Sequence, residues 1–175
     1  TSFTHPVTEE KKREVRAKYQ LPEHYILNVG SIEERKNALS AGQALTMLPE
    51  QIHLVIVGRH TEYTDKIERF IKENKLEERV HIISNVPFDD LPTFYQLAEI
   101  FVYPSRFEGF GIPIIEALYS GIPVVAATGS CLEEAGGPDS IYIHPDDIKG
   151  MANAFKQIYS DPERKKVMIE KGQIF

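Results

Sequence analysis

The stretch YILNVGSIEERKNALSAGQALTMLPEQIHLVIVG, residues 25–58, decides the fold class. It contains an apolar run at 25–30 and a second at 52–58, and each run ends in glycine. Residues 37–48, between the two runs, place apolar side chains at helical spacing. Strands that are apolar throughout are buried on both faces, which is typical of a parallel sheet covered by helices. The stretch therefore predicts a strand–helix–strand unit of a doubly wound α/β domain.

The same alternation continues along the chain and predicts a parallel sheet of about six strands in a single domain, residues 1–175. Further strands are expected at 79–84, 100–104, 123–127 and 140–144. Helices are expected at 8–20, 63–75, 88–98, 112–120, 146–159 and 161–171. Ligands of such folds bind outside the carboxyl ends of the strands. We therefore expect the binding site among the loops that follow strands, at 30–37, 58–62, 84–88, 104–111 and 127–132.

The composition excludes several classes of protein. The chain has 175 residues, of which 42% are apolar, and a net charge of −6. This negative charge argues against nucleic acid as a partner, because phosphate contacts need a basic surface. No apolar run approaches the length of a membrane span, and a single cysteine permits no intrachain disulfide. We expect a soluble, cytoplasmic domain with no membrane span in this chain.

The segment RFEGFGIPIIEALYSGIPVV, residues 106–125, contains two glutamates in unusual places. Glu108 stands in a glycine-rich turn, and Glu116 stands inside an otherwise apolar helix. The N–H groups and the dipole at the start of that helix favour an anion such as phosphate. A buried carboxylate needs hydrogen-bond donors, which the vicinal hydroxyls of a ribose would supply to Glu116. The alternative is that Glu116 caps a neighbouring loop or points into solvent.

The loop at 30–37 contains two adjacent cations, Arg35 and Lys36, at the carboxyl end of the first strand. A guanidinium binds phosphate bidentately and an ammonium binds it as a point charge, so the pair could hold a diphosphate. The alternative is a solvated charge run that Glu33 and Glu34 partly neutralise.

Other polar residues give weaker indications. The six histidines and the single cysteine show no spacing typical of metal ligands, so we expect no metal site. His53 and His81 lie within apolar strand runs and are expected to be sheet histidines. Asp89 and Asp90 are expected to form a helix start rather than a metal site.

Three segments together resemble a known family: VGSIEERKN (29–37), VYPSRFEGFGIPIIEALYSGIPVVAA (102–127) and GSCLEEAGG (129–137). They are similar to the nucleotide-sugar-binding, C-terminal half of the retaining GT-B-fold glycosyltransferases of family four, also called group 1. The similarity covers about residues 19–172. It implies a Rossmann-like sheet that forms one half of a GT-B fold. It also implies a GDP- or UDP-sugar as substrate, with no cofactor.

The resemblance implies a role for each matching residue. Glu108 matches the glutamate that faces the transferred sugar, which would make it the catalytic residue. Glu116 matches the glutamate that holds the ribose. The backbone N–H groups of Phe110, Gly111 and Ile112 would lie at the diphosphate or the sugar.

The same comparison places further donor-binding residues on the loops after the first and third strands. Lys36 matches the diphosphate lysine of the family. Family members often have an arginine where this chain has Ser31, and Arg35 would supply the guanidinium in its place. Asn85 and Val86 would border the nucleobase.

The resemblance also implies that a second half is absent from this chain. In the family, an N-terminal domain supplies a glycine-rich loop and binds the acceptor. The implied parent enzyme transfers a hexose, with mannose as the candidate, to a glycan or lipid-linked acceptor with retention. It would do so without a metal, in the cytoplasm or at the inner face of the membrane through the missing half. The fragment alone would be inactive.

Three other functions stay open at this point. A glycoside hydrolase could use Glu108 and Glu116 as its pair of carboxylates, but that reading gives Arg35 and Lys36 no task. A non-catalytic nucleotide- or sugar-binding α/β module would need the pocket alone. A dehydrogenase is a more distant alternative, because the first strand–helix turn has one glycine only.

Overall fold

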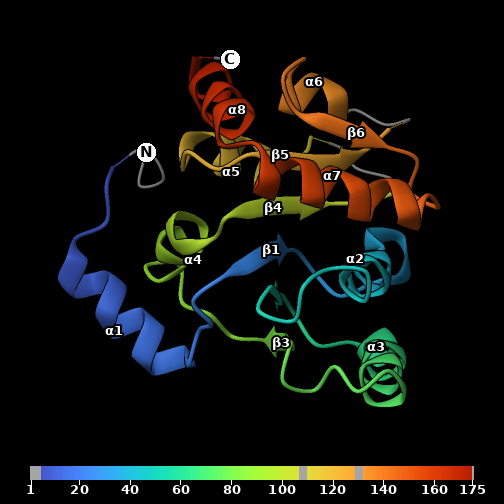
Figure 1. Cartoon of the computed structure of the whole chain (residues 1–175). Coiled ribbons are helices and arrows are strands. Elements are labelled where there is room, and N and C mark those ends of the chain that lie inside the picture. The colour runs from blue at the N-terminus through green and yellow to red at the C-terminus, as the bar shows by residue number, and fades with distance from the viewer. Residues whose placement is uncertain (1–4, 107–109, 129–131, 175) are drawn as a thin grey trace.

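The computed structural model describes residues 5–106, 110–128 and 132–174 (Figure 1). At its centre is a six-stranded sheet with the strand order β3-β2-β1-β4-β5-β6. Every neighbouring pair of strands is parallel. The strands are β1 (Tyr25–Val29), β2 (His53–Val57), β3 (Val80–Ile83), β4 (Ile100–Tyr103), β5 (Val124–Ala127) and β6 (Ile141–Ile143). The predicted doubly wound sheet is confirmed.

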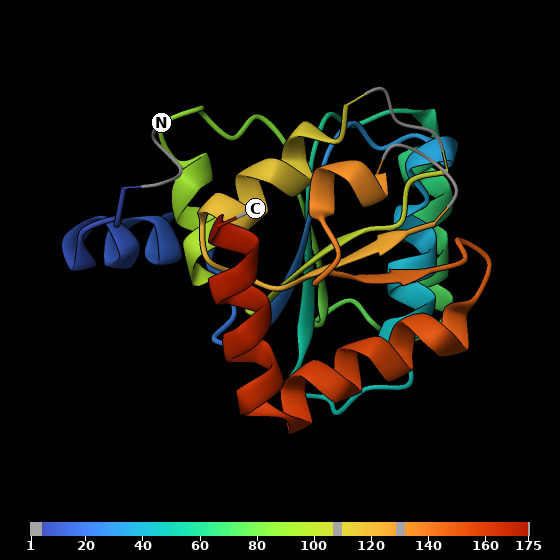
Figure 2. The same ribbon diagram turned by 90° about the horizontal axis from the view of Figure 1, so that it is seen from above.

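Helices cover both faces of this sheet (Figures 1 and 2). One face carries α2 (Ala38–Leu45), α3 (Glu62–Glu73) and α7 (Ile148–Ser160). The other carries α4 (Leu91–Leu97), α5 (Ile112–Tyr119) and α6 (Leu132–Gly136). At the side of the domain α1 (Glu9–Tyr19) packs against α4, and α8 (Pro162–Ile174) packs against α5 and α7.

Two hydrophobic clusters form the core because successive side chains of a strand point to opposite faces. Ile26 and Leu54 belong to the cluster beneath α2, α3 and α7. Leu27 and Phe101 belong to the cluster beneath α4 and α5. Each strand is therefore apolar on both faces, as the sequence indicates.

The strand–helix–strand unit at 25–58 forms as expected, and its two terminal glycines have a structural reason. β1 and β2 pair in register from Tyr25–His53 to Val29–Val57. The N–H of Gly30 donates to the carbonyl of Val57 over 2.9 Å. A Cβ atom on Gly58 would overlap the carbonyl of Gly30, so no other residue fits there.

The switch point of the sheet lies between β1 and β4, because strands before it are added on one side of β1 and strands after it on the other. β1 and β4 pair at Ile26–Ile100 and Leu27–Phe101. The loop after β1 leads to α2 on one face, and the loop after β4 leads to α5 on the other. A crevice opens where such loops diverge, and it is the usual ligand site of this fold. Asn28 is buried here and donates to the carbonyl of Val102 over 2.9 Å, which explains an amide within an apolar strand.

Three local features differ from the predictions. A 3-10 helix, η1 (Glu34–Lys36), occupies the loop after β1, and α6 occupies the loop after β5. Both are short and carry little periodic signal. Asp90 does precede α4, but its side chain caps nothing. It accepts hydrogen bonds from α1 instead, because it is buried against that helix.

Within the described residues, none of the helices combines the length and the apolar character that crossing a membrane requires.

Candidate functional site

Lys36 lies at the point where β1 and β4 diverge. Its Nζ atom donates to the hydroxyl of Tyr103 over 3.2 Å and lies 5.5 Å from the centre of that ring. Tyr103 is the last residue of β4, and Lys36 is the last residue of η1. The contact therefore holds an ammonium group at the carboxyl edge of the sheet, where the fold places its ligands.

Asn37 fastens the loop that carries Lys36. Its side-chain amide donates to the carbonyl of Pro104 over 3.1 Å and to that of Pro145 over 2.9 Å. The backbone of Asn37 is left-handed, with φ of 61°, a conformation that asparagine tolerates better than most residues. In addition, the N–H of Arg106 donates to the carbonyl of Arg35 over 2.8 Å. The loops after β1, β4 and β6 are therefore joined, and the predictions from sequence did not include Asn37.

Arg35 lies beside an acidic neighbour. Its guanidinium lies 3.3 Å from a carboxylate oxygen of Glu33, and the Arg35 side chain is 50% exposed. Arg59 also approaches Glu33, at 3.9 Å. Glu33 thus partly neutralises Arg35, whereas Lys36 contacts Tyr103. A diphosphate role for Arg35 remains a prediction.

The start of α5 brings Phe110, Gly111 and Ile112 to the same edge of the sheet. Gly111 is the N-cap residue with φ of 65°, and a Cβ there would lie 3.0 Å from the Cβ of Ala135 in α6. Glycine is needed here for its backbone conformation and for the packing of α6. Phe110 and Ile112 are 79% and 57% exposed, so the backbone beside them is open to a ligand.

Glu116 lies further along α5, half-buried, and does not point freely into solvent. Its Oε1 atom accepts a hydrogen bond from the hydroxyl of Tyr95 over 3.0 Å. Burial raises the pKa of Glu116, and the hydrogen bond from Tyr95 opposes that rise. The carboxylate is thus held in one place by α4.

Aromatic rings connect the surroundings of Glu116 with those of Lys36. Tyr95 stacks on Phe101 with 5.3 Å between ring centres, and Phe101 stacks on Tyr103 with 5.8 Å between ring centres. Phe101 and Tyr103 are alternate residues of β4 and so share one face of the sheet. Sequence reasoning did not select Tyr95 or Tyr103. The period-2 spacing at the end of β4 is the signal that could have found Tyr103.

Asn85 and Val86 follow β3, at the far side of the same edge. Asn85 is exposed with φ of 59°, and Val86 packs partly against the core beneath α4. β3 is separated from β4 by β2 and β1. By ordinary strand spacing, the end of β3 therefore lies about 14 Å along the edge from the end of β4. Glu108, the predicted catalytic residue, lies outside the described residues.

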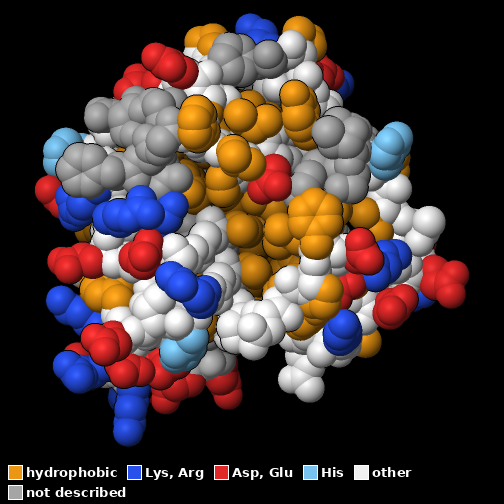
Figure 3. All heavy atoms as spheres, turned by 180° about the vertical axis from the view of Figure 1, so that it is seen from behind, with side chains coloured by type: hydrophobic (Ala, Val, Ile, Leu, Met, Phe, Trp, Pro, Cys, Tyr) orange, Lys and Arg blue, Asp and Glu red, His pale blue; other side chains and the backbone are white. Residues whose placement is uncertain are grey.

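The face that carries α4 and α5 has an apolar centre. Figure 3 shows hydrophobic side chains gathered there around a shallow hollow. Large apolar side chains are unusually exposed near the carboxyl edge of the sheet, since Phe88 is 67% exposed in addition to Phe110 and Ile112. An exposed patch of this kind commonly marks a binding surface.

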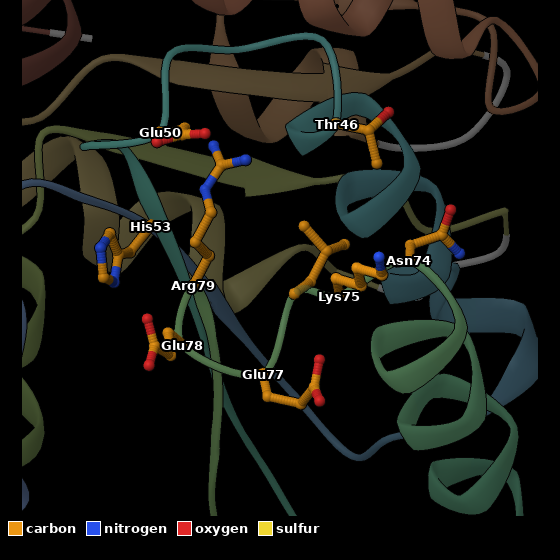
Figure 4. A pocket seen from close by; sticks show the side chains of 9 residues that line it. Thr46, Glu50, His53, Asn74, Lys75, Glu77, Glu78 and Arg79 are labelled. Atoms are coloured by element: carbon orange, nitrogen blue, oxygen red, sulfur yellow. The ribbon is translucent and has the colours of Figure 1, made fainter.

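A cavity of about 770 Å³ lies at the opposite, amino edge of the sheet (Figure 4). Arg79 lines it, but the guanidinium of this residue is used to hold the backbone. It donates to the carbonyl oxygens of Leu45, Leu48, Pro49 and Ile52. The cavity is therefore remote from the candidate site and structural in character.

His53 and His81 are sheet histidines, as predicted. The Nδ1 atom of His53 lies 2.9 Å from the Nε2 atom of His81 across neighbouring strands. Burial lowers the pKa of both.

Among the residues that the structure describes, one group of side chains has atoms that could bind a metal. The ligand atoms of His60, Asp65 and Glu68 lie within 4.8 Å of one another at the start of α3, and all three residues are exposed. Exposed acidic groups often gather in this way without an ion. The absence of a metal from the reaction stays a prediction.

Comparison with known proteins assigns the class. The sequence model of the family described as glycosyl transferases group 1 matches residues 9–175, and the chain belongs to this family. The fold and the family that the sequence motifs indicate are thus confirmed.

Particular relatives are known at moderate similarity. The chain is 32% identical over 160 residues to O-antigen chain mannosyltransferase B of Escherichia coli, covering 89% of this chain and 42% of that protein. Sucrose-phosphate synthase from Thermosynechococcus elongatus superposes with a TM-score of 0.85 at 28% identity, covering 98% of this chain and 44% of that one. The chain thus spans less than half of each of these proteins.

A third similarity concerns the fold alone. HepE of Anabaena, crystallised in complex with UDP and glucose, superposes with a TM-score of 0.89 at 19% identity. It covers 99% of this chain and 49% of the other.

Proposed function

We propose that this chain is the donor-binding domain of a glycosyltransferase that transfers a hexose from a nucleotide diphosphate sugar to an acceptor. The observation that carries the proposal is the Lys36–Tyr103 contact of 3.2 Å at the strand switch point. It holds a cation where the fold binds ligands, on the same edge as the start of α5. Membership of the group 1 family supports the reaction class.

The proposal gives each described site residue a task. Lys36 neutralises the diphosphate, together with the N–H groups and dipole at Gly111 and Ile112. Glu116 accepts hydrogen bonds from ribose hydroxyls, which its half-buried position favours. Phe110 and its backbone lie against the diphosphate or sugar.

Two further assignments concern the ends of the site. Arg35 lies 3.3 Å from Glu33 through one nitrogen, and its other N–H groups bind the diphosphate. Asn85 and Val86 border the nucleobase, at the far end of the site from the sugar.

Glu108 orients the transferred sugar in this proposal, and retention at the anomeric carbon follows from the resemblance to retaining enzymes. The donor is a GDP- or UDP-sugar. The complex of HepE with UDP supports a uridine nucleotide, and the mannosyltransferase of Escherichia coli supports mannose. The acceptor is proposed to be a glycan or a lipid-linked glycan, and the O-antigen chain in the name of that relative supports a glycan.

The acceptor is proposed to bind to a second domain of a longer protein. The 42% coverage of the relative from Escherichia coli supports this division. We further propose that the enzyme works in the cytoplasm, or at the inner face of the membrane through that second domain, and needs neither metal nor cofactor. The 175-residue chain alone would bind donor and transfer nothing.

Calorimetric titration with UDP and GDP tests the donor site directly. We expect binding of at least one of them, weakened by high salt because the diphosphate contacts are ionic. No binding of either nucleotide at millimolar concentration would overturn the proposal. Binding of a free oligosaccharide together with its hydrolysis would favour the glycoside hydrolase instead.

A further inference from the structure

Tyr95 contacts the candidate site from the protein core, where α4 meets α5. It is fully buried in α4, and its hydroxyl donates to Oε1 of Glu116 in α5 over 3.0 Å. Glu116 itself is only half-buried. A buried donor thus reaches one oxygen of a carboxylate that remains accessible to a ligand.

An ionised carboxylate only accepts hydrogen bonds, and its two oxygens offer about four acceptor positions. The bond from Tyr95 occupies one position on Oε1 and fixes the rotation of the carboxylate plane. Neighbouring hydroxyl groups of a ligand need both oxygens in one orientation. The direction of this plane therefore decides whether a pair of vicinal hydroxyls can be bound at once.

The phenol ring is itself well fixed. Tyr95 stacks on Phe101, and Phe101 stacks on Tyr103, whose hydroxyl accepts from Lys36. A residue held in this way loses little conformational entropy when its partner binds a ligand. The stack gives Glu116 and Lys36, two charged groups of the described part of the site, a common rigid base.

We propose that Tyr95 is a positioning residue that orients Glu116 toward the two ribose hydroxyls of the donor, and thereby sets selectivity for ribonucleotides over deoxyribonucleotides. The inference rests on the proposed function, in which Glu116 binds the ribose. It adds the residue that makes this contact selective. Tyr95 itself does not touch the donor.

The experiment compares UDP with 2′-deoxy-UDP by calorimetry, or the corresponding guanosine nucleotides if these bind better, in the wild-type chain and in Tyr95→Phe. In the variant, affinity for the ribonucleotide should fall about tenfold or more, as expected when a hydrogen bond to a charged group is lost. Affinity for the deoxynucleotide should change less than about twofold, because its contact with Glu116 is already incomplete. The ratio of the two affinities is the readout, since a general loss of stability would lower both equally.

Tyr19→Phe is the matched control. The hydroxyl of Tyr19 also donates to a carboxylate, Oδ2 of Asp90 over 2.7 Å, but Asp90 has no part in the proposed donor site. This variant should lower thermal stability and leave the affinity ratio unchanged. A change of the ratio equal to that in Tyr95→Phe would overturn the positioning role.

Glu116→Asp provides a second route if Tyr95→Phe does not fold. The shorter side chain cannot reach Tyr95 and the ribose together. The affinity for the ribonucleotide relative to the deoxynucleotide should therefore fall in the same way. An unchanged ratio in either variant overturns the inference while the donor site stands. A wild-type chain that binds no nucleotide overturns the proposed function and the inference with it.

Discussion

Asp90 accepts a hydrogen bond from Nζ of Lys11 over 2.8 Å, and this ion pair joins α1 to the start of α4. Lys18 and Tyr19 of α1 donate to the other oxygen of the same carboxylate, over 3.1 Å and 2.7 Å. The Asp90 side chain is 7% exposed, so a change that removes its charge leaves two cations without their partner. Asp90 thereby adds a buried ionic contact to the apolar packing of α1, in which Val15 is buried in the core.

The first prediction concerns Asp90→Asn. Burial alone would raise the pKa of Asp90, but hydrogen bonds from Lys11, Tyr19 and Lys18 lower it to about 2. The ordinary value is 3.8, so the charged form stabilises the fold above that pH, and the stabilisation is lost as the pH falls toward 2. We expect Asp90→Asn to lower the free energy of unfolding at pH 7 by about 1–2 kcal/mol, since the two lysines are partly exposed.

Urea denaturation at neutral and at acidic pH measures this effect. The difference between wild type and variant should shrink as the pH falls through the range between the two pKa values. Asp89→Asn is the control, because Asp89 is exposed and adjacent in sequence. An equal loss in both variants would contradict the role of Asp90.

The second prediction concerns Lys36→Met. The substitution keeps the unbranched, apolar part of the side chain but removes the charge beside Tyr103, so nucleoside diphosphate affinity should fall about tenfold or more. Calorimetry measures the affinity, and thermal unfolding should change little. Lys72→Met removes a charge from the exposed side of α3 and should leave the affinity as it is. If both variants bind equally well, Lys36 has no donor role.

The third prediction separates stability from binding at Glu116. Because burial raises the pKa of Glu116, the charged form is costly in the folded state at neutral pH, and protonation at lower pH relieves that cost. Glu116→Gln should therefore keep or raise the melting temperature while it weakens ribonucleotide binding. Glu134→Gln, on the exposed side of α6, is the control for the change in net charge. Unchanged nucleotide affinity in Glu116→Gln would remove its ribose role.

The fourth prediction compares Gly111, whose position requires glycine, with Gly42, whose position does not. Gly111→Ala forces a left-handed residue against Ala135 and should destabilise the domain by about 1–3 kcal/mol. Gly42→Ala adds a Cβ within α2 at 3.5 Å from Phe70, an ordinary contact, and should be neutral or stabilise by up to about 1 kcal/mol. Chemical denaturation of both variants gives the comparison. Equal stabilities would show that the entry into α5 is not constrained.

The fifth prediction addresses metal dependence. Nucleotide affinity should be the same in EDTA and in magnesium chloride, and His60→Ala should leave it unchanged, because the group at the start of α3 takes no part in donor binding. Calorimetry under the three conditions tests this. Magnesium-dependent binding that disappears in His60→Ala would assign the metal role to that group.

The sequence was sufficient to predict the sheet because its strands are buried on both faces and are therefore apolar throughout. Short elements such as η1 and α6 escaped prediction, since tertiary contacts rather than periodicity stabilise them. Lys36 and Glu116 could be selected as candidates because charged residues stand out in apolar or glycine-rich surroundings.

The supporting residues of the site could not be found in that way. Tyr95 resembles any other core aromatic in the sequence, and its contact with Glu116 joins residues 21 positions apart. The pairing of Asp90 with Lys11 joins residues 79 positions apart, so the sequence predicted the helix start at Asp90 but not the partners of its side chain. Such roles depend on which helices the fold brings together.

The amide of Asn37 has a mechanical consequence. A single side chain bridges the carbonyls of Pro104 and Pro145, which belong to segments following two different strands. These hydrogen bonds join three segments at Asn37, so we expect the segments to move together rather than independently. Slowed amide hydrogen exchange in any one of them on ligand addition should be accompanied by slowed exchange in the other two, and Asn37→Ala should uncouple them.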